Sequence, residues 1–235
     1  MQPGGAGWEV RLAKSMYTSG VMDPFSTETI ALIVALIMSI VLHEMAHGHA
    51  ANWLGDPTAR LQGRLSPNPL VHLDPLMSVI IPGLLVMSGS PILFGAAKPV
   101  PYNPYNFRNQ KWGEAIVAIA GPLANIFLAL VFAALVRSAD VLGLSAAFVD
   151  LAIGIIGLNI FLALFNLVPV PPLDGSKILP RLLPYQLAMR YESLRFAMER
   201  NLMLSFAIII LLFMVFLGEP LAAFTSQVVY LLAFA

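Results

Sequence analysis

His43, Glu44 and His47 form the pattern His-Glu-x-x-His, which has the residue types and spacing of a hydrolytic metal site. On an α-helix, positions i and i+4 lie about 40° apart around the axis, so both imidazoles face one point. They can therefore supply two ligands of a tetrahedral zinc ion. Glu44 is close enough to reach a water molecule at the metal and take its proton. The pattern predicts metal-assisted hydrolysis with Glu44 as the catalytic base.

A third protein ligand must come from elsewhere in the chain, and Asp174 is the best candidate. It follows the apolar segment 146–168, whose helix must end at the prolines that precede Asp174. Gly175 permits a turn directly after it. Weaker candidates are acidic residues in turns or at the start of an apolar segment: Asp56, Asp74 and Glu114.

The other two histidines fit the metal site less well. His49 lies about 200° from His47 around the helix, so we expect it to face away from the metal. His72 stands in a polar stretch between apolar segments, and we expect a surface loop histidine there. A position beside the metal ligands is the alternative for His72.

The composition excludes several classes of protein. Hydrophobic residues make up 58% of the 235 residues and charged residues 11%, against roughly 25% charged in soluble domains. A soluble enzyme, a disordered chain and a nucleic-acid-binding protein are therefore excluded. The 13 basic residues balance the 13 acidic ones, and the absence of cysteine excludes disulfides and thiolate metal sites.

Long apolar segments predict an all-α polytopic membrane protein with about five to six transmembrane helices. We expect an N-terminal polar segment at 1–27 and a single transmembrane domain at 28–235. The segment 76–94 contains proline and glycine, which favours a re-entrant or hairpin segment near 76–110 over a full crossing. The predicted spans are 29–54, 112–136, 146–168 and 202–217, with 221–235 as a further crossing or an interfacial helix.

The positions of the candidate ligands constrain the topology. For His43, His47 and Asp174 to meet at one depth, the helices 29–54 and 146–168 should run parallel, with 112–136 as the one crossing between them. The loops at 54–112 and 171–200 then share a side and carry 10 Lys and Arg residues, against 3 elsewhere. The excess of basic residues predicts that this side is cytoplasmic.

Three motifs together resemble the site-2 protease family of intramembrane zinc metalloproteases. They are His43-Glu-Met-Ala-His47 in an early span, Gly121-Pro-Leu-Ala-Asn125 in a later one, and Asn166-Leu-Val-Pro-Val-Pro-Pro-Leu-Asp174-Gly near a helix end. The similarity covers about residues 28 to 180. The segment from Phe94 to Pro101 is typical of compact prokaryotic members that lack a PDZ or regulatory domain.

The resemblance implies the roles of individual residues. His43, His47 and Asp174 would hold one zinc ion per chain, and Glu44 would be the catalytic base. Asn166, and with less support Asn125, would contact the substrate or the oxyanion. An asparagine within a span can instead make hydrogen bonds between helices. Leu173 directly before Asp174 departs from the commoner ending of the last motif, which affects only the local turn.

The sequence thus predicts a zinc metalloendopeptidase of the cell membrane, in prokaryotes the inner membrane, with its site nearer the cytoplasmic side. The expected partners are a membrane-protein substrate and the lipid bilayer, and no nucleic acid. The segment 76–110 could border an extended substrate. Two alternatives stay open: a metal transporter that uses the same cluster, and an inactive protease-like scaffold.

Overall fold

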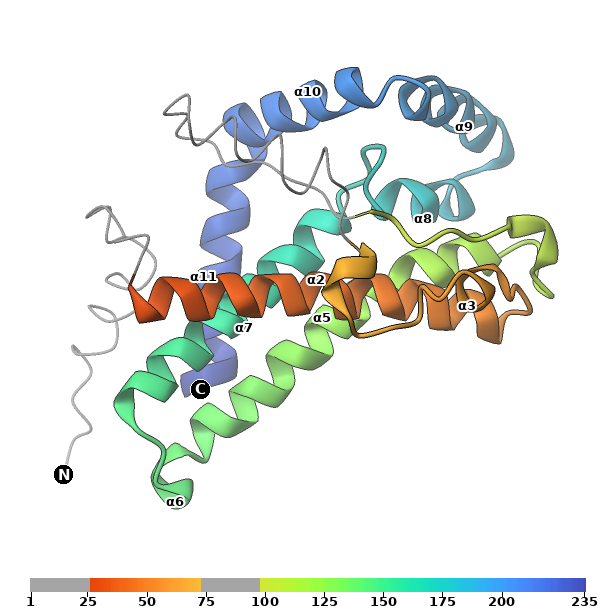
Figure 1. Ribbon diagram of the computed structural model, residues 1–235. Helices are drawn as coiled ribbons and strands as arrows, with labels where there is room; N and C mark the ends of the chain where they lie inside the picture. Colours follow the sequence, from red (N-terminus) through yellow and green to blue (C-terminus); the bar gives the residue numbers. More distant parts are fainter. Residues whose placement is uncertain (1–25, 73–97) are drawn as a thin grey trace.

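The computed structural model describes residues 26–72 and 98–235 of the chain, and these residues form helices and loops without a strand (Figure 1). The chain is an all-α polytopic membrane protein, as predicted. Its elements are α2 (Thr27–Trp53), α3 (Thr58–Leu61), η1 (Pro69–His72), η3 (Pro104–Asn106), α5 (Gly113–Arg137), α6 (Ala139–Leu142), α7 (Ala146–Asn166), α8 (Gly175–Leu182), α9 (Tyr185–Glu199), α10 (Leu202–Leu212), η4 (Phe213–Leu217) and α11 (Gly218–Phe234).

Four helical stretches of the described residues are long and apolar enough to cross a membrane: α2, α5, α7 and the stretch Met203–Phe234. The first three match the predicted spans 29–54, 112–136 and 146–168 to within a few residues. The predicted re-entrant segment 76–94 and most of the N-terminal polar segment 1–27 lie outside the described residues.

Local sequence explains where the spans begin and end. The side chains of Ser26 and Ser145 accept hydrogen bonds from the first turns of α2 and α7, at 3.1 and 3.2 Å, because serine satisfies the free N–H groups of a helix start. After α2 the chain turns at Gly55, whose φ of 110° suits glycine.

Helices α2 and α7 run parallel. Leu32 of α2 packs against Gly154 of α7, and farther along both helices Ser39 Oγ accepts a hydrogen bond from Asn159 Nδ2 at 3.0 Å. Contacts therefore advance along both helices in the same direction (Figure 1). The parallel arrangement expected from the candidate ligands is present.

Helix α5 packs against both of these helices and runs antiparallel to α2. Val117, near its start, contacts His47, whereas Asn125, two turns later, contacts the earlier residue His43. The packing of α5 against α7 and α11 is built largely from alanine and β-branched side chains, which let the helices approach closely. The buried residues of this cluster are Ala129, Ala133, Val136, Ala152, Ile153, Ile156, Ile160, Val229 and Ala233.

The predicted segments 202–217 and 221–235 are joined without a loop. One turn of π-helix, η4, links α10 to α11, and the chain turns sharply there (Figure 1). Pro220 lies in the first turn of α11 and has no N–H to continue the helical hydrogen bonds across the junction, where the chain turns. Because Val229 of α11 packs against Gly157 of α7, α11 belongs to the helix bundle.

Candidate metal centre

The side chains of His43, His47 and Asp174 converge in the buried interior, although Asp174 is far from the others in sequence. Asp174 Oδ2 lies 3.1 Å from His43 Nε2 and 3.3 Å from His47 Nε2. Adjacent ligands of a tetrahedral zinc ion are about 3.3 Å apart, given metal–ligand bonds near 2 Å. These two distances, with all three ligand atoms within 4.8 Å of one another, fit one small tetrahedral cation whose fourth position would take water or substrate.

Both imidazoles are oriented by oxygen acceptors at Nδ1, the ring nitrogen that does not face Asp174. His47 Nδ1 lies 2.7 Å from Val117 O, and His43 Nδ1 lies 2.5 Å from Asn125 Oδ1. An oxygen acceptor requires a proton on Nδ1, which leaves each Nε2 with a lone pair facing Asp174. Two lone pairs and a carboxylate oxygen would repel one another without a cation among them, so this donor set fits a metal ion.

Two glycines make the convergence possible. A Cβ atom on Gly121 of α5 would stand 2.5 Å from Nε2 of both His43 and His47, so any side chain there would fill the ion's place. A Cβ atom on Gly175 would stand 2.1 Å from the backbone oxygen of Leu167. This glycine lets the chain after α7 fold back and bring Asp174 to the histidines.

Behind His43, a chain of buried amides crosses the three packed helices. Asn125 Nδ2 of α5 donates to Asn159 Oδ1 of α7 at 2.8 Å. Asn159 Nδ2 donates in turn to Ser39 Oγ of α2 and to Ile155 O, both at 3.0 Å. Both asparagine side chains are fully buried.

Glu44 is held by the backbone of the segment Lys98–Val100. The Val100 N–H donates to Glu44 Oε2 at 2.9 Å. This segment is fixed in turn by the buried Arg64, whose Nη2 donates to Lys98 O at 2.6 Å and Pro99 O at 3.2 Å. One oxygen of the Glu44 carboxylate is thus positioned by the backbone.

The electrostatic surroundings keep Asp174 ionised. Burial alone would raise its pKa, but the N–H groups that protonated His43 and His47 direct at it when no cation is bound, together with the nearby Lys177 ammonium, hold that pKa well below its usual range. Burial would lower the pKa of Lys177, yet Tyr102 and Asp174 keep it above its usual value. An ionised carboxylate is the form that binds a metal.

The other candidate ligands have different partners. Glu114 pairs with Arg195 at 2.8 Å. Asp56 accepts hydrogen bonds from the loop at Asn103 and Asn106. Asp74 lies outside the described residues.

The two asparagines predicted to contact the substrate lie in different surroundings. Asn166 stands at the end of α7, where its Nδ2 donates to Leu162 O of the same helix at 2.9 Å. Asn125 lies behind His43, and both ends of its amide are engaged there. A contact with substrate stays a prediction for Asn166, whereas the observed bonds of Asn125 favour a role in orienting His43.

The remaining histidines take no part in the cluster. His49 is exposed, and its Nδ1 bonds to Met45 O of its own helix, so it faces away as expected. The expectation that His72 lies on the surface is wrong, because its side chain is only 1% exposed. It is buried because its Nε2 bonds to Ser66 O, while its own carbonyl accepts the Lys98 N–H.

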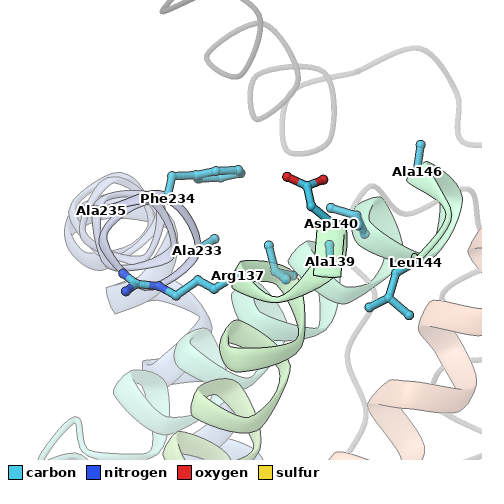
Figure 2. A pocket seen from close by; sticks show the side chains of 10 residues that line it. Arg137, Ala139, Asp140, Leu144, Ala146, Ala233, Phe234 and Ala235 are labelled. Carbon is cyan, nitrogen blue, oxygen red and sulfur yellow. The ribbon is translucent and has the colours of Figure 1, made fainter. Parts of the chain in front are cut away.

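A second hollow lies at the other end of α5 and is distinct from the metal centre. It has a volume of about 640 Å³ and lies where α5, α6, α7 and α11 meet (Figure 2). Arg137 there reaches across to α11 and donates to Leu232 O at 2.7 Å. Since the histidines contact the beginning and middle of α5, this hollow is remote from the candidate chemistry.

Several residues in or behind the centre carry no predicted role from the sequence. Gly121, Asn159, Ser39 and Arg64 are all buried or in contact with buried ligands. The available signal was polarity, since Ser39 and Asn159 interrupt apolar spans where polar groups need partners. Their pairing required the relative register of α2, α5 and α7.

Comparisons with known proteins agree with the geometry. The chain is 40% identical over 159 residues to a Bacillus subtilis protein named "Putative zinc metalloprotease YwhC", in a match that covers 65% of this chain and 69% of YwhC. It is 33% identical over 154 residues to "Putative zinc metalloprotease Rip2" of Mycolicibacterium smegmatis, covering 62% of this chain and 54% of that protein.

A shorter match reaches an archaeal protein. The chain is 38% identical over 92 residues to "Putative zinc metalloprotease MJ0611" of Methanocaldococcus jannaschii, covering 37% of this chain and 46% of that protein. No family model matches the chain, and no solved structure does.

Proposed function

The chain belongs to the compact site-2 protease-like family of zinc metalloproteases, and on that premise we propose that it hydrolyses peptide bonds within or beside the membrane. The substrates would be membrane-embedded or membrane-adjacent proteins. The proposal assigns His43, His47 and Asp174 as ligands of one zinc ion and Glu44 as the catalytic base.

The observation that carries this proposal is the convergence of three ligand atoms next to a glutamate on the same helix. Asp174 Oδ2 lies within 3.3 Å of both Nε2 atoms, and Glu44 directly follows His43. When bound, zinc supplies Lewis-acid chemistry, which lowers the pKa of water toward ~7 and polarises a carbonyl. The protein's own groups then have to move the protons.

Glu44 is suited to that proton transfer. With Oε2 fixed by the Val100 N–H, Oε1 is left to accept a proton from the attacking water. The protonated carboxyl then donates to the nitrogen of the leaving amine, which restores the base. Asn166, at the end of α7, is the residue we assign to contact with the substrate or the oxyanion.

The placement of the centre supports action at a membrane. Its two histidines lie in the second half of α2, a helix long and apolar enough to cross a bilayer, and the burial of these polar groups fits a metal-binding role. We assign the chain to the cell membrane, in prokaryotes the inner membrane, with this end of the bundle toward the cytoplasm. The charge asymmetry of 10 Lys and Arg residues against 3 supports that orientation.

A metal transporter would need ligand groups at successive depths. Within residues 26–72 and 98–235, the one group of three candidate ligands is His43, His47 and Asp174. A single compact centre with an adjacent base favours hydrolysis over transport.

Glu44→Gln tests the assignment most directly, because it removes the base and keeps the three ligands. Zinc content of the purified protein should stay at one per chain, while cleavage of a co-expressed membrane substrate should fall by at least about 100-fold. Glu28→Gln, at the exposed start of the same helix, is the matched control and should cleave normally. Retained cleavage in Glu44→Gln would refute the proposed mechanism.

A further inference from the structure

We propose that Asn159 is a positioning residue that fixes the tautomer of His43 through the amide of Asn125. This inference rests on the proposed metal centre, and it assigns a role to a residue that touches neither the ion nor the substrate. The three side chains come from α7, α5 and α2, so their contacts form only when these helices pack together.

The hydrogen bonds form one directed chain. His43 Nδ1 lies 2.5 Å from Asn125 Oδ1, and Asn125 Nδ2 donates to Asn159 Oδ1 at 2.8 Å. Asn159 Nδ2 then donates to Ile155 O at 3.0 Å. Asn125 and Asn159 are 0% exposed, so bulk solvent does not reach them.

The backbone oxygen of Ile155 sets the direction of the chain, because a carbonyl can only accept. If the Asn159 amide were reversed, its Oδ1 would face Ile155 O at 3.0 Å, and two acceptors would repel. Ser39 Oγ, the other partner of Asn159 Nδ2, can donate or accept and therefore does not set a direction. With Asn159 fixed, its Oδ1 requires the nitrogen of Asn125 to face it.

The direction of these hydrogen bonds matters at His43, where the series ends. The oxygen of Asn125 then faces His43 Nδ1, which must carry the proton, and Nε2 keeps the lone pair that a metal needs. A reversed Asn125 amide has nearly the same shape but offers an N–H to Nδ1. It would favour the other tautomer, with the proton on Nε2 and no lone pair for an ion.

The decisive experiment measures zinc affinity by chelator competition on the detergent-solubilised full chain, first in the native background. Asn159→Leu removes the group that orients Asn125, so zinc should bind about 10- to 100-fold more weakly. Asn159→Asp, whose carboxyl is protonated at this fully buried position, can donate its O–H to Ile155 O and still accept from Asn125 Nδ2, so it should keep most of the affinity. Ser39→Ala should change the affinity by less than about threefold, because Ile155 O still fixes the direction.

The second background carries Asn125→Asp, whose carboxylate accepts from His43 Nδ1 with either oxygen and cannot present an N–H. Asn159→Leu should cause no further loss of zinc affinity there. This result would separate amide orientation from simple packing, since a packing defect weakens binding in both backgrounds. If Asn159→Leu does not fold, as judged by helical circular dichroism, Asn159→Ala takes its place in both.

Equal loss of affinity in both backgrounds would overturn the inference, and so would unchanged affinity in the native background. Failure of the proposed metal centre gives a different result: the unaltered chain would not bind one zinc ion, or His43→Ala would bind zinc as tightly.

Discussion

The absence of a methyl group at Gly121 decides whether the two imidazoles can converge. The backbone of α5 passes so close to His43 and His47 that a Cβ atom would lie 2.5 Å from each Nε2. The ligands cannot retreat easily, because their Nδ1 atoms are bonded to α5 as well.

Gly121→Ala should therefore abolish zinc binding while the protein stays folded. Alanine favours a helix over glycine by about 1 kcal/mol, so a loss of affinity would come from the occupied site and not from a weaker helix. The matched control is Gly157→Ala in α7, where a Cβ atom would make an ordinary 3.7 Å contact with Val229. Zinc content after dialysis, together with helical circular dichroism, measures both. Full zinc content in Gly121→Ala would contradict the geometry of the centre.

Asp56 is a second residue whose hydrogen bonds indicate its structural role. It is 0% exposed and accepts hydrogen bonds from Thr58, Asn103 and Asn106. Burial alone would raise its pKa, but these hydrogen bonds outweigh burial and lower the pKa below its usual value. The ionised carboxylate thus ties the turn after α2 to the loop before α5.

Asp56→Asn should destabilise the fold in a pH-dependent way. Because the folded pKa lies below the unfolded value near 3.9, the carboxylate contributes stability fully above that value and loses it as pH falls through the folded pKa. We expect a deficit of about 1–3 kcal/mol for the variant at pH 7 that shrinks below about pH 4. Thermal unfolding in detergent from pH 7 to pH 3 measures the difference. A deficit that does not depend on pH would contradict the ionised role.

At the residue scale, the sequence identified those functional residues that a local pattern along the chain reveals. His43, Glu44 and His47 share a helical pattern, and the proline-rich stretch pointed to Asp174. The partners of these residues depend on distances between helices, which no spacing encodes. Asn125 and Asn159 are separated by 34 positions, so their contact follows only from the register of α5 against α7.

Among the elements, the segment Lys98–Val100 is the one that donates a hydrogen bond to the base. Arg64 donates to two successive carbonyls of this segment, and the next N–H, that of Val100, holds Glu44. Arg64 is 6% exposed and forms no ion pair with a carboxylate of the described residues. A buried charge without a counter-ion is costly, which fits a role in holding this backbone.

Arg64→Met keeps the aliphatic stem and removes both hydrogen bonds. We expect zinc content to stay at one per chain, while the rate of substrate cleavage falls by about tenfold or more because Glu44 is less well positioned. Arg60→Met, at an exposed arginine of the preceding helix α3, should behave as the unaltered chain. If Arg64→Met cleaves at the normal rate, the segment does not position the base.

Sequence patterns located the spans but not the connections between them. Apolar length predicted α2, α5 and α7, since this signal is local. The π-helical junction of α10 and α11 was not foreseen, because Gly218 and Pro220 also fit a loop. The packing of α11 against α7 decides whether this junction is a loop or a helix.

For the whole molecule, charge is distributed unevenly between the two ends of the bundle. The metal centre lies beside loops rich in Lys and Arg, whereas the far end, with α6 and the hollow of Figure 2, holds Arg137 as its described basic residue. Basic loops stay on the cytoplasmic side during insertion. The side of the membrane on which the centre lies therefore depends on the charges of all the loops and not on any one residue of the site.

Single cysteines can test this orientation, because the chain has none of its own. Val141→Cys near α6 and Tyr105→Cys in the loop before α5 replace side chains that are 90% and 88% exposed. A membrane-impermeant maleimide added to intact cells should label Val141→Cys and leave Tyr105→Cys unlabelled until the cells are permeabilised. Labelling of both from the same side would refute the assigned topology.

The bonding of residues 98–101 limits how another polypeptide can approach Glu44. Pro99 and Pro101 have no N–H, and the N–H groups of Lys98 and Val100 are already bonded to His72 O and Glu44. This stretch therefore has no amide hydrogen left to complete a β-ladder with a passing strand. A polypeptide drawn alongside it would have to contribute its own amide hydrogens, and a proline-rich sequence would be the poorest at doing so.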